Sequence, residues 1–264
     1  MTDELVLGCE QRGPVRWITL NRPHRRNALT PGLIAAFRSA LDDVGNDPET
    51  SVVVVAGSGP SFCAGADLWY LQELSEAGAD PTVFLREVSA CFEILEELPR
   101  PVIAAVQGHC VAGGLELALA CDIVIAERGA LIGDGHVRNG LIPAGGASVR
   151  LPRRLPEPIG RRLMLTGQLV PAEELAPFGL PHVVTEPGGL SAAVDRVVAD
   201  LCAADPSAQR AVKHLLNQLR RTPYELAYEC ESKAFASHWA TADVKTPLSR
   251  FVARSRPADE TVSS

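Results

Sequence analysis

Three short runs of apolar, mostly β-branched residues constrain the fold of this chain more than any other feature. The runs are SVVVVAG (51–57), RPVIAAVQG (100–108) and DIVIAE (122–127). A continuous apolar run indicates a strand that is buried on both faces, as in a parallel sheet. The stretch between the last two runs, VAGGLELALACD (111–122), is typical of a short apolar helix. Strands and helices therefore alternate, and the sequence predicts an α/β fold.

The segment TPGLIAAFRSALDDV (30–44) predicts an amphipathic helix that follows a strand at VRWITLN (15–21). Thr30 suits the N-cap, and Pro31 suits the first helical position because its missing N–H would have no partner there. From about residue 155 onward the pattern is mainly helical. The expected apolar face of the first helix is formed by Leu33, Phe37, Ala40, Leu41 and Val44.

The composition and charge of the chain exclude several classes of protein. Its 264 residues are 46% hydrophobic and 22% charged, which is typical of a globular protein with a sizeable core. The net charge of −7 disfavours nucleic-acid binding. The N-terminus has no secretory pattern, and no apolar run is long enough to span a membrane. Seven cysteines without a C-x-x-C pair predict reduced thiols in a cytoplasmic protein and give no metal site.

Four common catalytic and nucleotide-binding motifs are absent from the sequence. No strand is followed by G-x-G-x-x-G, and no G-x-x-x-x-G-K-[ST] phosphate loop occurs. G-x-S-x-G and H-E-x-x-H are missing as well. The sequence therefore lacks the strongest signature of a dinucleotide-binding oxidoreductase, of a P-loop nucleotidase and of an α/β-hydrolase.

Small residues gather where two of the expected strands give way to helices, in SGPSFCAGADL (58–68) and HCVAGGLELALACD (109–122). Backbone N–H groups at the start of a helix have no intrahelical partner, and glycine leaves them open to a ligand. Two such groups that converge on one oxygen form an oxyanion hole. The alternative is two tight turns that need glycine only for their backbone angles.

Glu116 interrupts the apolar helix of the second segment. Its neighbours at helical spacing are alanine, glycine and leucine, with no cation or hydrogen-bonding side chain among them. Burial raises the pKa of a carboxyl group toward the range of a general acid or base. The pattern favours a catalytic Glu116 over a structural one.

These residues resemble the crotonase, or enoyl-CoA hydratase/isomerase, superfamily. The matching pieces occur in the order of the family and extend over nearly the whole chain. They are ITLNRPHRRNAL (18–29), SFCAGADL (61–68), RPVIAAVQGHCVAGGLELALACDIVIA (100–126), GLIPAGG (140–146) and LTGQLVPAEELAPFGLPHVV (165–184).

The resemblance implies a spiral of ββα units over residues 1–200 and a helical region over residues 201–264 that forms homotrimers, often paired into hexamers. It also implies an acyl-CoA thioester whose carbonyl oxygen lies between the N–H groups of Ala66 and Gly113. Trp69, Tyr70 and the segment 71–98 are expected to line the acyl pocket, and ordinary packing is the alternative for the two aromatic residues. For Arg25 and Arg26 a solvated basic turn is the alternative. Residues matched to the substrate or CoA site are Arg25, Arg26, Ala28, Ala64, Asp67, Leu68, Trp69 and Arg254.

The resemblance also implies a departure from the family pattern. Glu116 matches the first of two hydratase glutamates, and the second is expected seven residues before Pro143, where this chain has His136. Asp134, two residues earlier, is a candidate to support it. Carbon–carbon bond hydrolases of β-diketones carry a histidine in this neighbourhood but pair it with an aspartate nine residues later, and they lack the Glu116 equivalent. That later position is Gly145 here.

Enoyl-CoA hydration, with Glu116 and His136 as acid and base, is therefore the leading hypothesis. Double-bond isomerisation, decarboxylation and hydrolysis of a carbon–carbon or thioester bond by the same two residues are the alternatives. A binding protein that retains the fold without turnover is a further alternative, and the isolated Glu116 argues against it. No cofactor is expected, because coenzyme A is part of the substrate.

Overall fold

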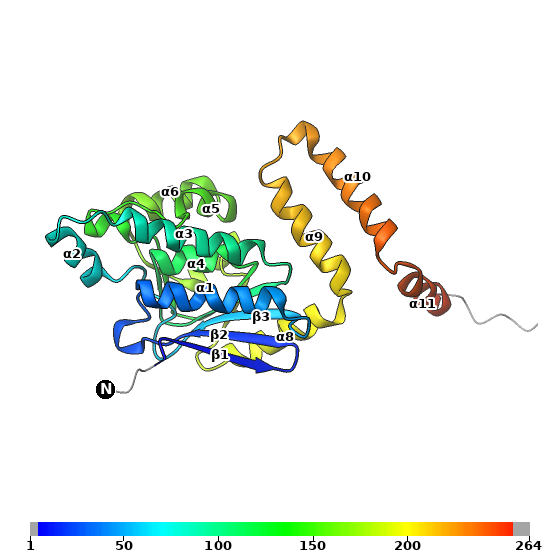
Figure 1. Ribbon diagram of the computed structural model, residues 1–264, viewed down its shortest axis with the longest axis horizontal. Helices are drawn as coiled ribbons and strands as arrows, with labels where there is room; N and C mark the ends of the chain where they lie inside the picture. Colours follow the sequence, from blue (N-terminus) through cyan, green and yellow to red (C-terminus); the bar gives the residue numbers. More distant parts are fainter. Residues whose placement is uncertain (1–4, 256–264) are drawn as a thin grey trace, which may run out of the picture. The chain divides into compact units, whose positions relative to one another are not determined.

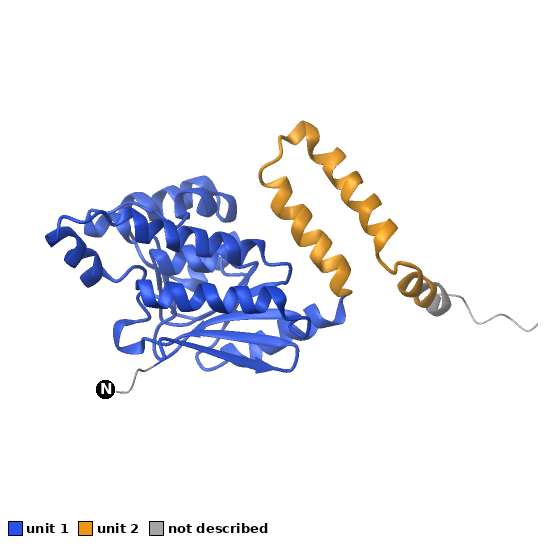
Figure 2. Ribbon diagram, in the orientation of Figure 1, with its two compact units in different colours: residues 1–204 blue, residues 205–264 orange. Residues whose placement is uncertain are grey.

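The computed structural model describes residues 5–255, and side chains as far as residue 250. It divides into two compact units, residues 1–204 and 205–264 (Figure 2). The boundary predicted between residues 200 and 201 falls inside helix α8 (Leu190–Ala203), and the division follows the end of that helix.

Unit 1 contains a six-stranded sheet in the order β1-β2-β3-β4-β6-β9. β1 and β2 form an antiparallel hairpin, and every later pair is parallel. A second, three-stranded sheet has the order β5-β7-β8. The strands are β1 (Leu7–Arg12), β2 (Val15–Leu20), β3 (Val52–Gly57), β4 (Val102–Val106), β5 (His109–Val111), β6 (Ile123–Glu127), β7 (Leu131–Gly133), β8 (Val170–Pro171) and β9 (Val183–Thr185).

The central strands β3 and β4 of the large sheet are buried on both faces, as their continuous apolar runs predict. Alternate side chains of a strand point to opposite faces. Val53 and Val55 of β3 accordingly join the main core with α1, α3 and α4, whereas Val52 and Val54 join a second core with α8 (Figure 1). The helices of unit 1 are α1 (Pro31–Asn46), α2 (Leu68–Glu76), α3 (Thr82–Glu97), α4 (Gly113–Ala120), α5 (Ala147–Arg154), α6 (Glu157–Thr166), α7 (Ala172–Leu175) and α8, with 3₁₀ turns η1 (Pro23–Arg25), η2 (His136–Asn139) and η3 (Ala176–Phe178).

The strands and helices predicted from the longest patterns are confirmed to within two residues. Thr30 caps α1, with its Oγ1 accepting from the N–H of Leu33, and all five predicted apolar-face residues are buried. Five strands were not predicted: β1, β5, β7, β8 and β9. Four of them are three residues long or shorter, too short for a periodic signal. β1 has one buried residue, at its start, so its sequence shows no core pattern.

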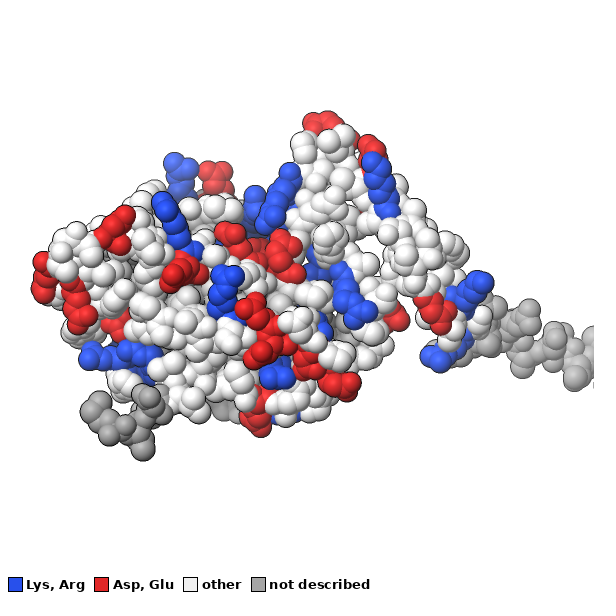
Figure 3. All heavy atoms as spheres, viewed as in Figure 1, with Lys and Arg blue, Asp and Glu red and all other residues white. Residues whose placement is uncertain are grey.

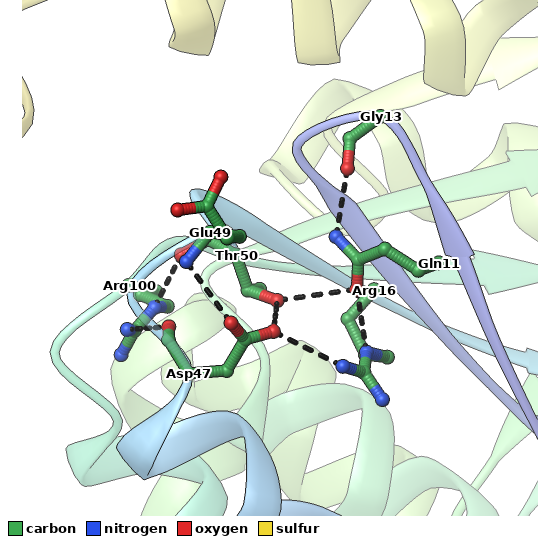
Figure 4. Close-up of polar contacts among 7 residues, drawn as sticks. All are labelled: Gln11, Gly13, Arg16, Asp47, Glu49, Thr50 and Arg100. Atoms are coloured by element: carbon green, nitrogen blue, oxygen red, sulfur yellow. Dashed lines mark hydrogen bonds and ion pairs between the residues drawn. The ribbon is translucent and has the colours of Figure 1, made fainter.

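A polar network ties the amino ends of the parallel strands together (Figure 4). Asp47, just after α1, accepts hydrogen bonds from Arg16 of β2 at 3.0 Å and from Thr50, before β3, at 2.7 Å. Arg100, before β4, donates to the backbone carbonyls of Asp47 and Thr50. Because the amino ends are fixed in this way, loops that follow the carboxyl ends remain available for a site.

Unit 2 is helical and consists, as described, of α9 (Pro206–Leu219), α10 (Tyr224–Thr241) and α11 (Lys245–Ser255), with α9 packed against α10. Four aromatic side chains of α10 are more than half exposed, at 74%, 66%, 64% and 53%. They form a ring-to-ring pair at each end of the helix, Tyr224 with Tyr228 and Phe235 with Trp239.

On the face shown in Figure 3, acidic and basic side chains of unit 1 are interspersed and form no basic stripe. None of the helices searched in residues 5–255 is long and apolar enough to cross a membrane. The cysteines are all free thiols, four of them buried.

Candidate active site

A cavity of about 500 Å³ lies beyond the carboxyl ends of β3 and β4. Its walls are mostly aliphatic, and Glu116 and His136 are the two ionisable side chains among the described residues that line it. The segment 71–98 contributes to this wall through α2, α3 and the connection between them. The lining residues are Leu29, Ala66, Leu71, Ser75, Gly78, Ala79, Pro81, Leu85, Val88, Gly113, Glu116, His136, Leu141, Ile142, Ala144 and Gly145.

Two backbone N–H groups meet at the cavity, those of Ala66 and Gly113. The N–H of Leu29 donates to Gly65 O at 2.8 Å, and the carbonyl of Leu29 accepts from the N–H of Asp67 at 2.9 Å. Because the residues on either side of Ala66 both face Leu29, the N–H of Ala66 points to the opposite side. Gly113 is the first residue of α4, so its N–H has no intrahelical acceptor. Neither N–H donates a hydrogen bond within residues 5–255.

The two segments that carry these N–H groups are in close contact. A Cβ placed on Gly113 would lie 3.4 Å from the nitrogen of Ala66, and one on Gly65 would lie 2.9 Å from the nitrogen of Gly113. Ala112, between β5 and α4, has φ 52° and ψ −116°, a conformation that residues with a Cβ rarely adopt. The conformation of Ala112 places Gly113 at the wall of the cavity. The predicted pair of small-residue segments is thus brought together.

Glu116 lies in the first turn of α4 and is 3% exposed. Its Oε1 accepts two hydrogen bonds, from the N–H of Gly145 at 2.9 Å and from that of Ala147 at 3.0 Å. Burial raises the pKa of the Glu116 carboxyl, and the two N–H donors and His136 offset part of that rise. The buried carboxyl group is thereby suited to exchange a proton.

His136 begins η2, and its Nδ1 lies 3.1 Å from Oδ1 of Asp134. Asp134 is fully buried, and its Oδ2 has no hydrogen-bond partner in the described part of the chain. A carboxylate at Nδ1 fixes that nitrogen as the donor, which leaves Nε2 for a reacting group. Burial lowers the pKa of His136, but the hydrogen bond and charge of Asp134, with the charge of Glu116, outweigh it and raise the pKa overall.

A second cavity of about 400 Å³ shares Ala66 with the first. It brings together all the described residues that sequence predicted for the CoA site. Trp69 lies here and not in the wall of the first cavity, with its ring under the Arg25 guanidinium at 4.4 Å, whereas Tyr70 lines neither cavity and packs edge-on against Phe84, the ordinary packing that was the alternative for it. The lining residues are His24, Arg25, Arg26, Ala28, Ala64, Ala66, Asp67, Leu68 and Trp69. The side chain of Arg254 lies outside the described residues.

Asp67 has a structural part in this second cavity. Its Oδ1 caps α2 by accepting from the N–H of Trp69 at 3.1 Å, and its Oδ2 pairs with Arg22 at 3.0 Å. Arg22 also donates to the carbonyl of Ala28 at 2.5 Å. These contacts fix the loop on either side of Ala66.

Sequence reasoning missed the groups that hold Glu116 in place. The donors are backbone atoms of residues 145 and 147, and the turn between them is fixed by Arg150, whose Nη1 donates to Gly145 O at 2.8 Å. The two adjacent glycines of LIPAGG were the available signal, because a side chain on either would collide with Glu116 or Arg150.

Comparison with known proteins connects this geometry to a family. Residues 10–260 match the enoyl-CoA hydratase/isomerase family. The crotonyl-CoA hydratase of Syntrophomonas wolfei is 32% identical over 255 residues, which cover 95% of each chain. The short-chain-enoyl-CoA hydratase of Clostridium acetobutylicum is 32% identical over 92% of this chain and 93% of its own.

A solved structure gives the same result for the fold. The crystal structure of an enoyl-CoA hydratase from Polaromonas sp. JS666 has a TM-score of 0.88 and 31% identity, and the match covers 94% of this chain and 97% of that one. The predicted α/β fold of the crotonase type, with its C-terminal helices, is thereby confirmed. The chain belongs to the enoyl-CoA hydratase/isomerase family, the crotonase superfamily.

Proposed function

We propose that this protein is an enoyl-CoA hydratase in which Glu116 and His136 are the acid and base. One observation carries the proposal: a single apolar cavity presents a buried carboxyl group, an imidazole and two unbonded N–H groups. The N–H groups of Ala66 and Gly113 would hold the thioester oxygen, where negative charge accumulates as water adds. One such donor is worth about 3–4 kcal/mol of barrier.

Each residue has a defined part in the proposed reaction. Glu116 accepts a proton from water as the water oxygen bonds to the β-carbon, and the electron pair of the double bond moves to the thioester oxygen. The imidazolium of His136 then gives a proton to the α-carbon, and the proton on Glu116 returns to His136. The sum is the addition of one water molecule. The raised pKa of His136 supports this division, because it favours the protonated ring.

A contact at Gly145 argues against the carbon–carbon bond hydrolase alternative. The sequence resemblance assigns that chemistry an aspartate nine residues after the histidine, at position 145. A Cβ on Gly145 would lie 2.5 Å from Oε2 of Glu116. The backbone therefore accommodates either Glu116 or a side chain at position 145, and this chain has Glu116.

The second cavity supports a binding site for the CoA part of the substrate. Arg25 and Arg26 place two guanidinium groups beside it, and guanidinium groups pair well with phosphates. Coenzyme A belongs to the substrate, so the proposed reaction takes no further cofactor. The free thiols support a reducing compartment such as the cytoplasm.

We also propose that unit 2 assembles the chain into homotrimers, alone or in pairs. The support is the exposed aromatic surface of α10, since contiguous exposed apolar surface marks an interaction site. Light scattering after size-exclusion chromatography tests it with Phe235→Asp/Trp239→Asp, which we expect to lower the assembly state. A trimer that survives the double substitution contradicts this role for α10.

Turnover of crotonyl-CoA and of longer trans-2-enoyl-CoA esters tests the proposed activity, followed by loss of the conjugated thioester absorbance. Glu116→Gln and His136→Gln are expected to lower kcat at least about a hundredfold each, the usual effect of removing an acid or base. Glu93→Gln and His214→Gln change exposed residues outside the cavities and serve as matched controls.

Three outcomes separate the candidate functions. Hydration that depends on both residues supports the proposal. Turnover of a 3-enoyl-CoA without hydration favours an isomerase. Tight binding of acyl-CoA in a thermal-shift assay without any turnover favours a binding protein.

A further inference from the structure

An ion pair behind the cavity, between buried Arg150 and partly buried Glu96, contacts the turn that holds Glu116. Arg150 of α5 is 8% exposed. Its Nε and Nη2 both lie 3.0 Å from Oε2 of Glu96 in α3, and its Nη1 donates to Gly145 O at 2.8 Å. Neither Arg150 nor Glu96 lines either of the two cavities. The pair is therefore outside the reach of a substrate.

The turn at Gly145 and Gly146 is enclosed between this guanidinium and the carboxyl group of Glu116. A Cβ on Gly146, at φ +105°, would lie 2.1 Å from Nη1 of Arg150. A Cβ on Gly145 would lie 2.5 Å from Oε2 of Glu116. Gly145 thus faces Arg150 with its carbonyl and Glu116 with its N–H, and its backbone has little freedom to rotate between them.

Stability alone does not account for a charged pair in this place. Buried ion pairs are often replaced by apolar residues with no loss of stability, because removing charges from water costs about as much as their attraction returns. Their better-attested use is to fix one geometry among several. Here the geometry that is fixed is the backbone turn whose two N–H groups hold Oε1 of Glu116.

We propose that Arg150, anchored by Glu96, is a positioning residue for Glu116. It holds the Gly145 carbonyl so that the N–H groups of residues 145 and 147 both stay on Oε1. Oε2 then remains the oxygen that faces the reacting water. Because Glu96 belongs to α3, which also lines the first cavity, the pair further fixes the turn relative to that wall.

This role has a consequence for proton transfer. Hydrogen bonds from backbone N–H groups favour the charged form of a carboxyl group. When Arg150 is removed, the turn loosens, those two bonds weaken, and the pKa of Glu116 rises. The acidic limb of the kcat/KM profile then moves to higher pH. A role in folding alone would leave that limb unchanged.

Arg150→Met, Arg150→Lys and Glu96→Gln test this inference, which rests on the proposed hydratase activity. We expect Arg150→Met to lower kcat about tenfold or more, the usual effect of a lost charge-assisted hydrogen bond, with KM within about threefold of wild type. Lysine offers a single ammonium in place of the fork, so Arg150→Lys recovers part of the loss. Glu96→Gln removes the charge of Glu96 but keeps an oxygen that accepts a hydrogen bond from Arg150. It is the variant to measure if Arg150→Met does not fold.

Arg154→Met is the matched control. Arg154 lies in the same helix and donates to backbone carbonyls at the end of α4 and just after it, those of Leu119, Cys121 and Asp122, and none of these three belongs to the Gly145 turn. We expect it to lower Tm and to leave the pH profile in place. A profile unchanged in Arg150→Met, or shifted equally in Arg154→Met, overturns the inference.

An infrared measurement distinguishes this inference from the hydratase proposal. The carbonyl stretch of protonated Glu116, assigned with Glu116→Gln, gives the pKa of Glu116 without turnover. A wild-type protein with no activity refutes the hydratase proposal, whereas the carboxyl band still decides the role of Arg150. The inference requires that band to persist to higher pH in Arg150→Met than in wild type, and an unmoved band refutes it.

Discussion

Adding one methyl group at Gly145 is expected to disable the proposed active site without unfolding the protein. The new Cβ would lie 2.5 Å from Oε2 and 2.9 Å from the carboxyl carbon of Glu116, and 3.3 Å from a ring carbon of Phe92. Normal contact requires about 3.4 Å or more, so the carboxyl group has to move by about 1 Å. Phe92 is fully buried and does not yield first.

A displacement of that size has effects on both catalysis and stability. The hydrogen bonds to Oε1, now 2.9 and 3.0 Å long, would stretch beyond the range of a hydrogen bond. A misplacement of about 1 Å costs about a hundredfold in rate, and overpacking costs about 1–3 kcal/mol of stability. We therefore expect Gly145→Ala to lower kcat/KM for crotonyl-CoA about a hundredfold and to lower the free energy of unfolding by about 1–3 kcal/mol.

Two further variants test the predicted collision between a side chain at position 145 and Glu116. Gly45→Ala adds the same methyl group inside α1, where nothing lies within 4 Å of the new Cβ, and should leave kcat/KM unchanged. In a Glu116→Ala background the obstructing carboxyl is gone, so Gly145→Ala should cost much less stability there. Denaturant titrations of the four proteins of this double-mutant cycle measure the coupling. Equal costs in both backgrounds would refute the predicted collision.

Substitutions at three other residues, Asp134, Glu116 and Thr30, also have predictable effects. Asp134→Asn removes the negative charge that helps to raise the pKa of His136 and leaves only a neutral acceptor for Nδ1, while burial still lowers that pKa. NMR titration of the ring should therefore give a lower pKa than in wild type, and an unchanged value would contradict the pairing. The raised pKa of Glu116 means that the folded state binds its proton more tightly, so this contribution to stability is present below the ordinary value of 4.5 and is lost as the pH rises through the folded pKa. Glu116→Gln should accordingly melt above wild type at neutral pH, and the two Tm values should converge in acid. Thr30→Ala removes the N-cap of α1 and should lower the free energy of unfolding by about 1 kcal/mol, whereas Thr30→Ser should retain most of it.

The fold was predictable where burial left a recognisable pattern of apolar residues in the sequence. β3 and β4 lie between two cores, so both of their faces are apolar and the run is continuous in the sequence. β5 and β7 have three residues each and are defined by pairing with each other across 22 residues of chain, which no local pattern encodes. Helix α3 packs five residues into the core, but its sequence was treated only as a pocket wall.

Part of the candidate site was also predictable from the pattern of buried residues. Glu116 stood out because an apolar helix is a costly place for a carboxyl group. Its partners did not stand out, because they are N–H groups that any residue carries, delivered by a turn 29 residues away in the chain. Trp69 was matched both to the acyl pocket and to the CoA site from its place in the sequence, and α2 places its ring against Arg25, at the second cavity. Contacts that depend on how a helix is rotated come from the packing and not from local sequence.

The pair of His136 and Asp134 gives a physical reason why a histidine can stand where the family pattern has a second glutamate. A glutamate that exchanges a proton changes its charge between 0 and −1. His136 with Asp134 passes between the same two values, because Asp134 supplies −1 and the ring alternates between +1 and 0. The charge seen by the cavity is therefore preserved, whereas the proton is exchanged at the pKa of a histidine that is raised above 6.5. A pair of this kind keeps its proton to higher pH than an ordinary glutamate would, which suits the proposed role of His136 as the donor to the α-carbon and that of Glu116 as the base.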